Sequence, residues 1–216
     1  MPTEPVIFLE ATSAICGPYD GVIKARDSRK LDWEVELGVV IGERAKRVAA
    51  ESAFDYVAGF CVINDISERE FQLERGGTWD KGKGCDTFEP IGPWLVTRDE
   101  IADVNDMVLW LDVNGRRFQN GSTQTMIFKP DCLVSYVSRF MTLLPGGIVS
   151  TGTPPGVGLG QKPPRYLEAG DVMELGIESL GPTTTDSGRR GETHNRERRL
   201  HGVIEPRNLR LPRIES

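Results

Sequence analysis

Short apolar runs separated by glycine and proline make up most of the first 180 residues of this chain. Runs of this length, rich in Val, Ile and aromatic residues and bounded by turn-forming residues, are typical of β-strands. We therefore expect an α+β fold that is mainly β, with few helices. The clearest predicted strands cover residues 33–41, 56–63, 93–96, 108–113, 148–151 and 172–177.

A turn and two helices complete this prediction. Asn114-Gly115 suits a type I′ turn, so the strand 108–113 should fold back on residues 116–119 as a hairpin. The best helix covers residues 131–144, with Asp131 as the predicted cap and Pro145 followed by two glycines as its end. A short helix should begin at Ser67, because Ser67 and Glu70 have the spacing of a capping box.

The last segment of the chain, residues 181–216, has a different composition. It holds eight Arg, no Lys and both histidines of the chain, and it is poor in aliphatic residues. Such a segment buries little apolar surface. We predict a catalytic domain over residues 1–180 and a divergent, Arg-rich, disordered tail over 181–216. His194 and His201 are then tail residues, not catalysts.

Composition narrows the class of protein. The chain has 216 residues, of which 38% are hydrophobic and 27% charged, and no apolar run approaches the length needed to cross a bilayer. We therefore expect a soluble, cytoplasmic protein. Its net charge of −6 predicts binding to neither nucleic acid nor an anionic membrane. Reduced thiols are expected, because the four cysteines are widely separated: Cys16, Cys61, Cys85 and Cys132.

Candidate chemistry begins at Glu34 and Glu36. Side chains two apart on a strand point to one face, so both carboxylates should project together while Trp33, Val35 and Leu37 cover the other face. Gly38 follows on the acidic face and should leave room for something to approach the strand. An amphipathic strand with its glutamates in water is the alternative interpretation.

Asp65 ends an apolar run, directly before the predicted helix start, where binding sites are commonly built. An ordinary turn aspartate is the alternative. Together with Glu34 and Glu36 it forms an oxygen-only ligand set, which favours Mg²⁺, Mn²⁺ or Ca²⁺ over zinc.

Two glycine-rich segments add further candidates. Lys83 lies between Gly82 and Gly84, where it could meet an anionic substrate or a developing enolate, or be a flexible surface lysine. Residues 150–160 lack the ending of a phosphate-binding loop and contain two prolines, so a turn lining the substrate fits better than a nucleotide site.

Five ordered segments carry a resemblance to the fumarylacetoacetate hydrolase superfamily, which extends from about residue 3 to 181. They are DWEVELGVVIG (32–42), VINDISEREFQ (62–72), KGKGCDTF (81–88), NGSTQTMIF (120–128) and PGGIVSTGTPPGVG (145–158).

The resemblance assigns roles by motif position. It implies Glu34, Glu36 and Asp65 as metal ligands and Lys83 as the catalytic lysine. Substrate contacts are implied for Arg69, Gln72 and Thr153. It also implies a mixed β-sandwich roll and a homodimer. The amino-acid sequences of the motifs most resemble those of the branch of 2,4-diketo-3-deoxy-sugar-acid hydrolases, often called ureidoglycolate lyases.

For function, the resemblance implies metal-dependent cleavage of a carbon–carbon bond in a small 2,4-diketo acid, giving pyruvate and a second acid. Fold membership alone does not select the reaction. Family members carry an N-terminal segment and a lid with a His-Glu pair, and we expect this chain to lack both. Two alternatives therefore remain. One is an oxaloacetate-type decarboxylase or lyase, and the other is an inactive paralogue that binds metal and keto acid without turnover.

Overall fold

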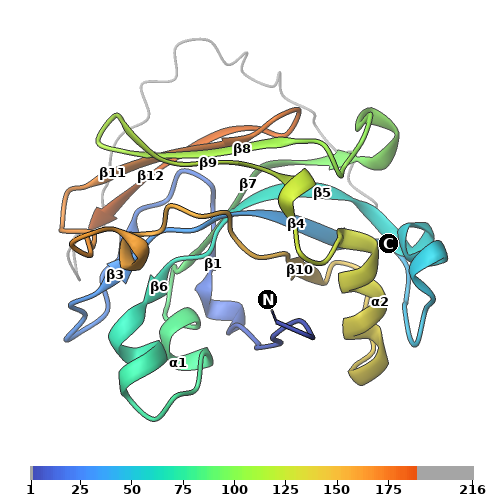
Figure 1. The fold of residues 1–216 in the computed structure, drawn as a ribbon, viewed down its shortest axis with the longest axis horizontal. Helices are drawn as coiled ribbons and strands as arrows, with labels where there is room; N and C mark the ends of the chain where they lie inside the picture. The colour runs from blue at the N-terminus through green and yellow to red at the C-terminus, as the bar shows by residue number, and fades with distance from the viewer. Residues whose placement is uncertain (1, 189–216) are drawn as a thin grey trace, which may run out of the picture.

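β-Strands form most of the regular structure in this computed structural model, which describes residues 2–188 (Figure 1). The strands are β1 Ile15–Cys16, β2 Val22–Ile23, β3 Leu31–Asp32, β4 Val35–Ile41, β5 Val57–Asn64, β6 Ser67–Glu68, β7 Glu89–Thr97, β8 Val108–Val113, β9 Arg116–Ser122, β10 Ile148–Ser150, β11 Val172–Ile177 and β12 Gly181–Gly188. The α-helices are α1 Asp80–Lys83 and α2 Pro130–Phe140, and a π-helix spans Glu70–Glu74. Short 3-10 helices cover Thr12–Ala14, Ala50–Tyr56, Arg98–Glu100, Thr123–Thr125 and Gly158–Gly160.

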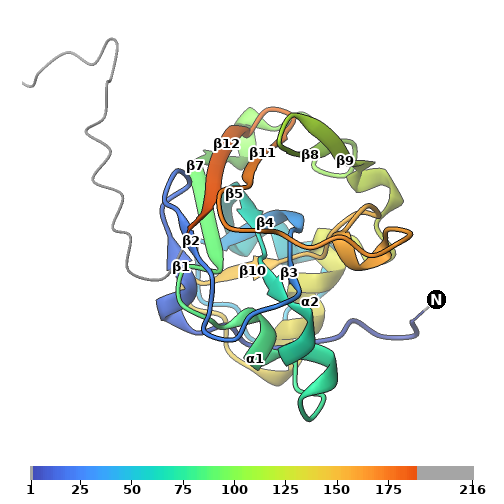
Figure 2. The ribbon, with the colours of Figure 1, turned by 90° about the vertical axis from the view of Figure 1, so that its left-hand side faces the viewer.

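Two five-stranded mixed sheets pack face to face. One has the order β1-β7-β5-β4-β10 and the other β2-β12-β11-β8-β9, while β3 and β6 form a separate pair. Each sheet contains one parallel pairing at its edge, β1 with β7 and β2 with β12. Figure 2 shows the two sheets curling around a shared interior, while α1, α2 and the N-terminal segment lie on the other side of the first sheet. The predicted mainly β, α+β fold with a mixed roll is confirmed.

β4 and the two residues before it separate the apolar core from the acidic face. Trp33, Val35 and Leu37 are fully buried in the core between the sheets, as the two-residue period predicts. Glu34 and Glu36 therefore point to the opposite face, toward α1 and α2. This division between the two faces of one strand is what positions the candidate site.

The predicted strands are present, several with shifted ends. β8 and β11 have the predicted bounds, and the hairpin turn has positive φ at both Asn114 (51°) and Gly115 (74°), as a type I′ turn requires. β7 is longer than predicted, beginning at Glu89. Proline usually argues against a strand, but only Glu89 and Pro90 of β7 pair with β1, so Pro93 lies where β1 no longer pairs with β7.

Both helix predictions need correction. Ser67 lies in β6, opposite Asp32, and its hydroxyl donates to the Asp65 carbonyl, so the chain turns into a π-helix only from Glu70. α2 begins at Pro130 and ends at Phe140, four residues early, because Leu143 is drawn into an antiparallel bridge with Ala45.

The caps of these helices also differ from prediction. The cap position of α2 is Lys129, so Asp131 lies inside the first turn, where its carboxylate accepts from the Cys132 N–H. A negative charge there still favours the positive end of the helix dipole.

The predicted boundary of the tail at Gly181 is wrong, because Gly181–Gly188 form β12. This strand pairs antiparallel with β11 over six residues and parallel with β2. Every second residue of β12 is buried, namely Thr183, Thr185 and Ser187. The two-residue period of a strand is therefore present, but hydroxyl residues form its buried face in place of aliphatic ones. Residues 189–216, with both histidines, lie outside the described part. Among the described residues, no helix is long and apolar enough to cross a membrane.

We predict that a chain ending at Leu180 is much less stable than one ending at Gly188. Losing β12 exposes β11 and removes the partner of β2, a cost of several kcal/mol against a typical domain stability of about 5–15 kcal/mol. Thermal unfolding of the two truncated chains measures the difference. Equal melting temperatures would show that β12 contributes nothing to stability.

Candidate metal centre

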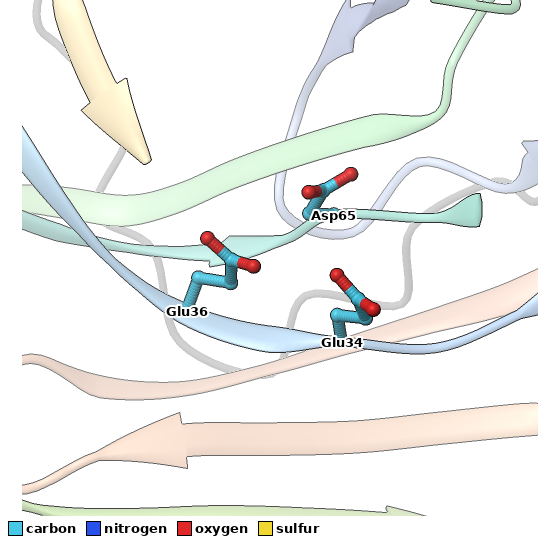
Figure 3. A group of neighbouring side chains, drawn as sticks. All are labelled: Glu34, Glu36 and Asp65. Atoms are coloured by element: carbon cyan, nitrogen blue, oxygen red, sulfur yellow. The ribbon is translucent and has the colours of Figure 1, made fainter. Parts of the chain in front are cut away.

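Three carboxylates converge beneath the first sheet. Glu34 directly precedes β4, Glu36 is the second residue of β4, and Asp65 follows the end of β5 (Figure 3). The antiparallel register sets Glu36 opposite Ile63, and the Asp65 N–H donates to the Glu34 carbonyl at 2.9 Å. One oxygen from each residue then lies within 4.8 Å of the others, so the group can hold a metal ion. All three are buried, so the alternative of water-facing glutamates is wrong.

Each carboxylate has its own set of hydrogen bonds. Glu34 accepts from Arg69 through Oε1 and from the Lys83 ammonium, 2.7 Å away, through Oε2. Glu36 Oε2 accepts from the Ser150 hydroxyl at 2.6 Å and the Gly152 N–H at 2.7 Å. These bonds fix the orientation of the carboxylates.

Asp65 supplies the test of whether a metal ion fits. Its Oδ2 accepts from Lys83, but its Oδ1 is buried and has no hydrogen-bond partner among the described residues. The whole residue is only 1% exposed. A buried carboxylate oxygen without a partner is costly unless a cation is bound to it. With three oxygen ligands and no sulfur or imidazole among them, the donor set suits a hard divalent ion such as Mg²⁺, Mn²⁺ or Ca²⁺.

The charges at the cluster are not balanced. Burial raises the pKa of Glu36 well above its usual value, and the charges of Asp65 and Glu34 raise it further. Burial also raises the pKa of Asp65 well above its usual value, against the opposing charge of Lys83. On Glu34 the effect of burial is outweighed by Lys83 and Arg69, and its pKa is lowered.

Lys83 is a buried residue at the end of α1, not the flexible surface lysine of the alternative interpretation. It is 2% exposed and pairs with both Glu34 and Asp65. Burial alone would lower its pKa, but Asp65 and the two glutamates outweigh burial and raise it, so the ammonium stays charged. Gly82 lets α1 approach closely, since a Cβ there would come within 2.8 Å of the Glu68 carbonyl.

The residues expected to contact substrate occupy different places. Arg69 lines the cavity and pairs with Glu34. Gln72 lies behind it, accepting from Arg69 NH1 at 3.0 Å, and is not part of the cavity wall. Thr153 lines the cavity, but its hydroxyl donates to the Val35 carbonyl at 2.8 Å and so fastens the glycine-rich turn to β4.

Gly38 does not leave the expected room. A Cβ on Gly38 would meet Cys61 Sγ and Ile63 Cδ1, both at 2.7 Å, so neighbouring side chains of β5 already fill the space. Glycine is needed there for packing within the sheet. The open space lies nearer the start of the strand, where Glu34 and Glu36 line the cavity.

Four polar residues near the site were missed in the sequence: Glu10, Asp32, Glu89 and Gln119. Glu10 lies on the N-terminal segment beside Glu89 of β7, and both of its carboxylate oxygens are buried without a hydrogen-bond partner in residues 2–188. Gln119 of β9 donates to Thr153 Oγ1 and to the Pro154 carbonyl, both at 2.8 Å. For Asp32, the sequence offered one local signal: its position directly before the alternating pattern of Trp33 to Leu37.

A cavity of about 730 Å³ opens onto the carboxylates. Its charged end is formed by the three carboxylates with Lys83 and Arg69. The rest of its wall comes mainly from the N-terminal segment, the residues before α2 and the glycine-rich turn. The turn therefore lines the cavity, and its contact with substrate stays a prediction. Apolar wall residues include Phe8, Leu109, Met126, Phe128, Val157 and Leu159.

Comparison with known proteins adds relatives with this architecture. Residues 1–186 match the family described as fumarylacetoacetate (FAA) hydrolase C-terminal. A protein of Burkholderia multivorans that carries only a general hydrolase name is 61% identical over 182 residues, which are 84% of this chain and 64% of the relative. A Burkholderia cenocepacia protein of similar name is 60% identical over the same shares. The chain thus spans about 64% of the length of these curated relatives.

Solved structures agree with the fold. The fumarylacetoacetate hydrolase of Exiguobacterium antarcticum superposes with a TM-score of 0.83 at 39% identity, covering 87% of this chain and 67% of that one. The 2-hydroxyhepta-2,4-diene-1,7-dioate isomerase of Mycobacterium marinum gives 0.81 at 39% identity, covering 88% and 71%. The five ordered motifs, the mixed roll and the family match over residues 1–186 agree, and this chain belongs to the fumarylacetoacetate hydrolase family.

Proposed function

We propose that this chain carries the catalytic site of a divalent-metal-dependent hydrolase that cleaves a carbon–carbon bond of a small 2,4-diketo acid. The observation that carries the proposal is the buried group of Glu34, Glu36 and Asp65 with the Lys83 ammonium at its edge, in one cavity of about 730 Å³. Hydrolases and isomerases both occur among the relatives, so the choice of reaction is our proposal.

Charge balance supports the metal. Five acidic side chains influence one another here: Glu34, Glu36 and Asp65, with Glu10 and Glu89 beside them. Lys83 and Arg69 are the cations paired with the cluster. Like charges this close raise one another's pKa unless a cation compensates them. Glu34, Glu36 and Asp65 would hold Mg²⁺ or Mn²⁺, with Ca²⁺ as a third candidate.

The proposed reaction balances without a redox partner. The water oxygen adds to the C4 carbonyl carbon, the C3–C4 bond breaks, and the second acid leaves with that oxygen. The electron pair stays on C3 as a pyruvate enolate, which takes up the proton that the water gave up on attack and becomes pyruvate. When bound, a divalent cation withdraws electron density from the oxygens of the 2-keto acid.

The chain's own residues support this chemistry by position. Lys83 stays protonated at the edge of the cluster, where a preorganised cation stabilises a developing enolate. Arg69 presents its guanidinium in the cavity wall, where it can bind a substrate carboxylate. Ser150 and the Gly152 N–H hold the Glu36 carboxylate in place.

Decarboxylation of an oxaloacetate-type acid is a second candidate. One observation favours it: among the described residues, the charged side chains that pair with the three carboxylates are Lys83 and Arg69. Protonated side chains stabilise an enolate and do not activate water. Release of carbon dioxide needs no attacking water. The homodimer, the cytoplasmic location and the lack of nucleic-acid or membrane partners remain predictions.

We predict that Mn²⁺ binds at the three carboxylates and stabilises the protein. Mn²⁺ at 100 times its dissociation constant should stabilise the protein by roughly 2.7 kcal/mol. Glu36→Gln and Asp65→Asn should lose this gain, while the exposed Glu43→Gln keeps it. Calorimetric titration and thermal unfolding with and without Mn²⁺ measure both. Unchanged Mn²⁺ binding in the two buried variants would rule out this site.

The chemical step is predicted to depend on Lys83. With Mn²⁺, the chain should cleave acetylpyruvate or decarboxylate oxaloacetate, and EDTA should abolish the activity. Lys83→Met should lose about 10²–10³ in kcat, the usual loss for a preorganised charge. Lys81→Met, an exposed lysine on the same helix, is the matched control. Full activity in Lys83→Met would remove the lysine from the mechanism, and metal binding without either activity would favour an inactive paralogue.

The acidic surroundings of the site predict a dependence of stability on pH. Burial and the neighbouring Glu89 carboxylate raise the pKa of Glu10 to about 9. A raised folded-state pKa contributes stability that is present below the unfolded value of 4.5 and is lost as pH rises toward 9. In EDTA, Glu10→Gln should therefore flatten the fall in melting temperature between about pH 5 and 9.

At pH 8 the gain from Glu10→Gln should exceed about 1 kcal/mol, since one pKa unit corresponds to about 1.4 kcal/mol. The exposed Glu100→Gln should behave as wild type. A variant with the same pH dependence as wild type would contradict the raised pKa.

A further inference from the structure

Asp32 is a carboxylate beside the site whose two oxygens are both fully hydrogen-bonded. It is fully buried at the end of β3 and accepts four N–H groups. Oδ2 accepts from Arg69 Nε at 2.8 Å and from the Leu159 N–H at 2.9 Å. Oδ1 accepts from the Gly158 N–H at 2.6 Å and from the Trp33 N–H at 2.8 Å.

These bonds join two walls of the cavity that are distant in the sequence. Arg69 follows β6, which lies beside β3 (Figure 1). The Arg69 N–H donates to the Lys30 carbonyl, so the backbone of Arg69 is fixed beside Lys30, two residues before Asp32. Gly158 and Leu159 belong to the glycine-rich turn, 126 and 127 residues after Asp32. Asp32 is the point at which both walls meet.

The fit at this point is tight. A Cβ on Gly158 would lie 1.9 Å from the Arg165 carbonyl and 2.8 Å from Asp32 Oδ1, so only glycine allows the turn to approach. On the other side, Arg69 uses Nε for Asp32, NH1 for Gln72 and NH2 for Glu34. A planar guanidinium held at three corners has one orientation in the cavity wall.

We propose that Asp32 is a positioning residue of the candidate site: one carboxylate fixes both the Arg69 guanidinium and the Gly158–Gly160 turn, and so sets how an anionic substrate is bound. The part that concerns substrate rests on the proposed function. Asp32 is not one of the three grouped carboxylates, so its removal should affect the binding of an organic anion more than the binding of the metal.

The variant that tests this is Asp32→Asn, which keeps the shape but turns an NH₂ group toward either Arg69 or the turn. Oxalate serves as the probe of a small dicarboxylate. Calorimetry should show oxalate binding to the Mn²⁺-loaded protein weakened at least about tenfold, with Mn²⁺ affinity within about threefold of wild type. KM for the keto acid should rise more than kcat falls.

A second measurement does not depend on metal or substrate. Hydrogen exchange at the Gly158 and Leu159 amides should become faster in Asp32→Asn, because their acceptor is replaced. Asp112→Asn is the matched control: Asp112 also pairs with an arginine, Arg117, but on the hairpin of β8 and β9, outside the cavity wall. It should change neither readout.

A double-mutant cycle separates positioning from general packing. If Asp32 acts through Arg69, Asp32→Asn should cost much less oxalate affinity in an Arg69→Lys background than in wild type. Additive losses, an equal loss of Mn²⁺ affinity, or unchanged exchange at the turn would each overturn the proposal. A wild-type protein that binds neither Mn²⁺ nor oxalate would refute the proposed function, while the exchange rates would still decide whether Asp32 fixes the turn.

Discussion

The pairing of buried carboxylates with Lys83 and Arg69 is the interaction on which the rest of the structure around the site depends. Glu34, Glu36 and Asp65 are all nearly inaccessible to solvent. Buried charge is tolerated only when it is paired and hydrogen-bonded. α1 and the segment after β6 therefore have to lie against the first sheet, because they carry the two cations.

The same requirement explains why the glycine-rich turn is held so firmly. Ser150 and the Gly152 N–H donate to Glu36, and Thr153 fastens the turn to β4. Gln119 and Asp32 hold it from two further strands. Each bond satisfies a buried polar group and also orients part of the cavity wall. The same contacts therefore satisfy the buried polar groups and set the geometry of the site.

Family membership and site chemistry answer different questions about this chain. The family match and the superposed structures establish the architecture and place hydrolases and isomerases among its relatives. They do not select a reaction, because one fold supports several. The unpartnered Asp65 Oδ1 and the excess of acidic side chains support a divalent ion, and the position of Lys83 supports enolate chemistry.

Local pattern in the sequence was enough to predict the faces of β4, the turn at Asn114-Gly115 and the grouping of Glu34 with Glu36, because strand period and turn preference depend on neighbouring residues. Only the tertiary structure decided which distant groups compensate the buried charges. Lys83 and Arg69 lie 49 and 35 residues from Glu34, and Gly158 lies 126 residues from Asp32. β12 was likewise missed, because its threonines become a buried strand face only when β11 and β2 pair with it. Pairing across such separations depends on the folded arrangement, which periodicity along the chain does not encode.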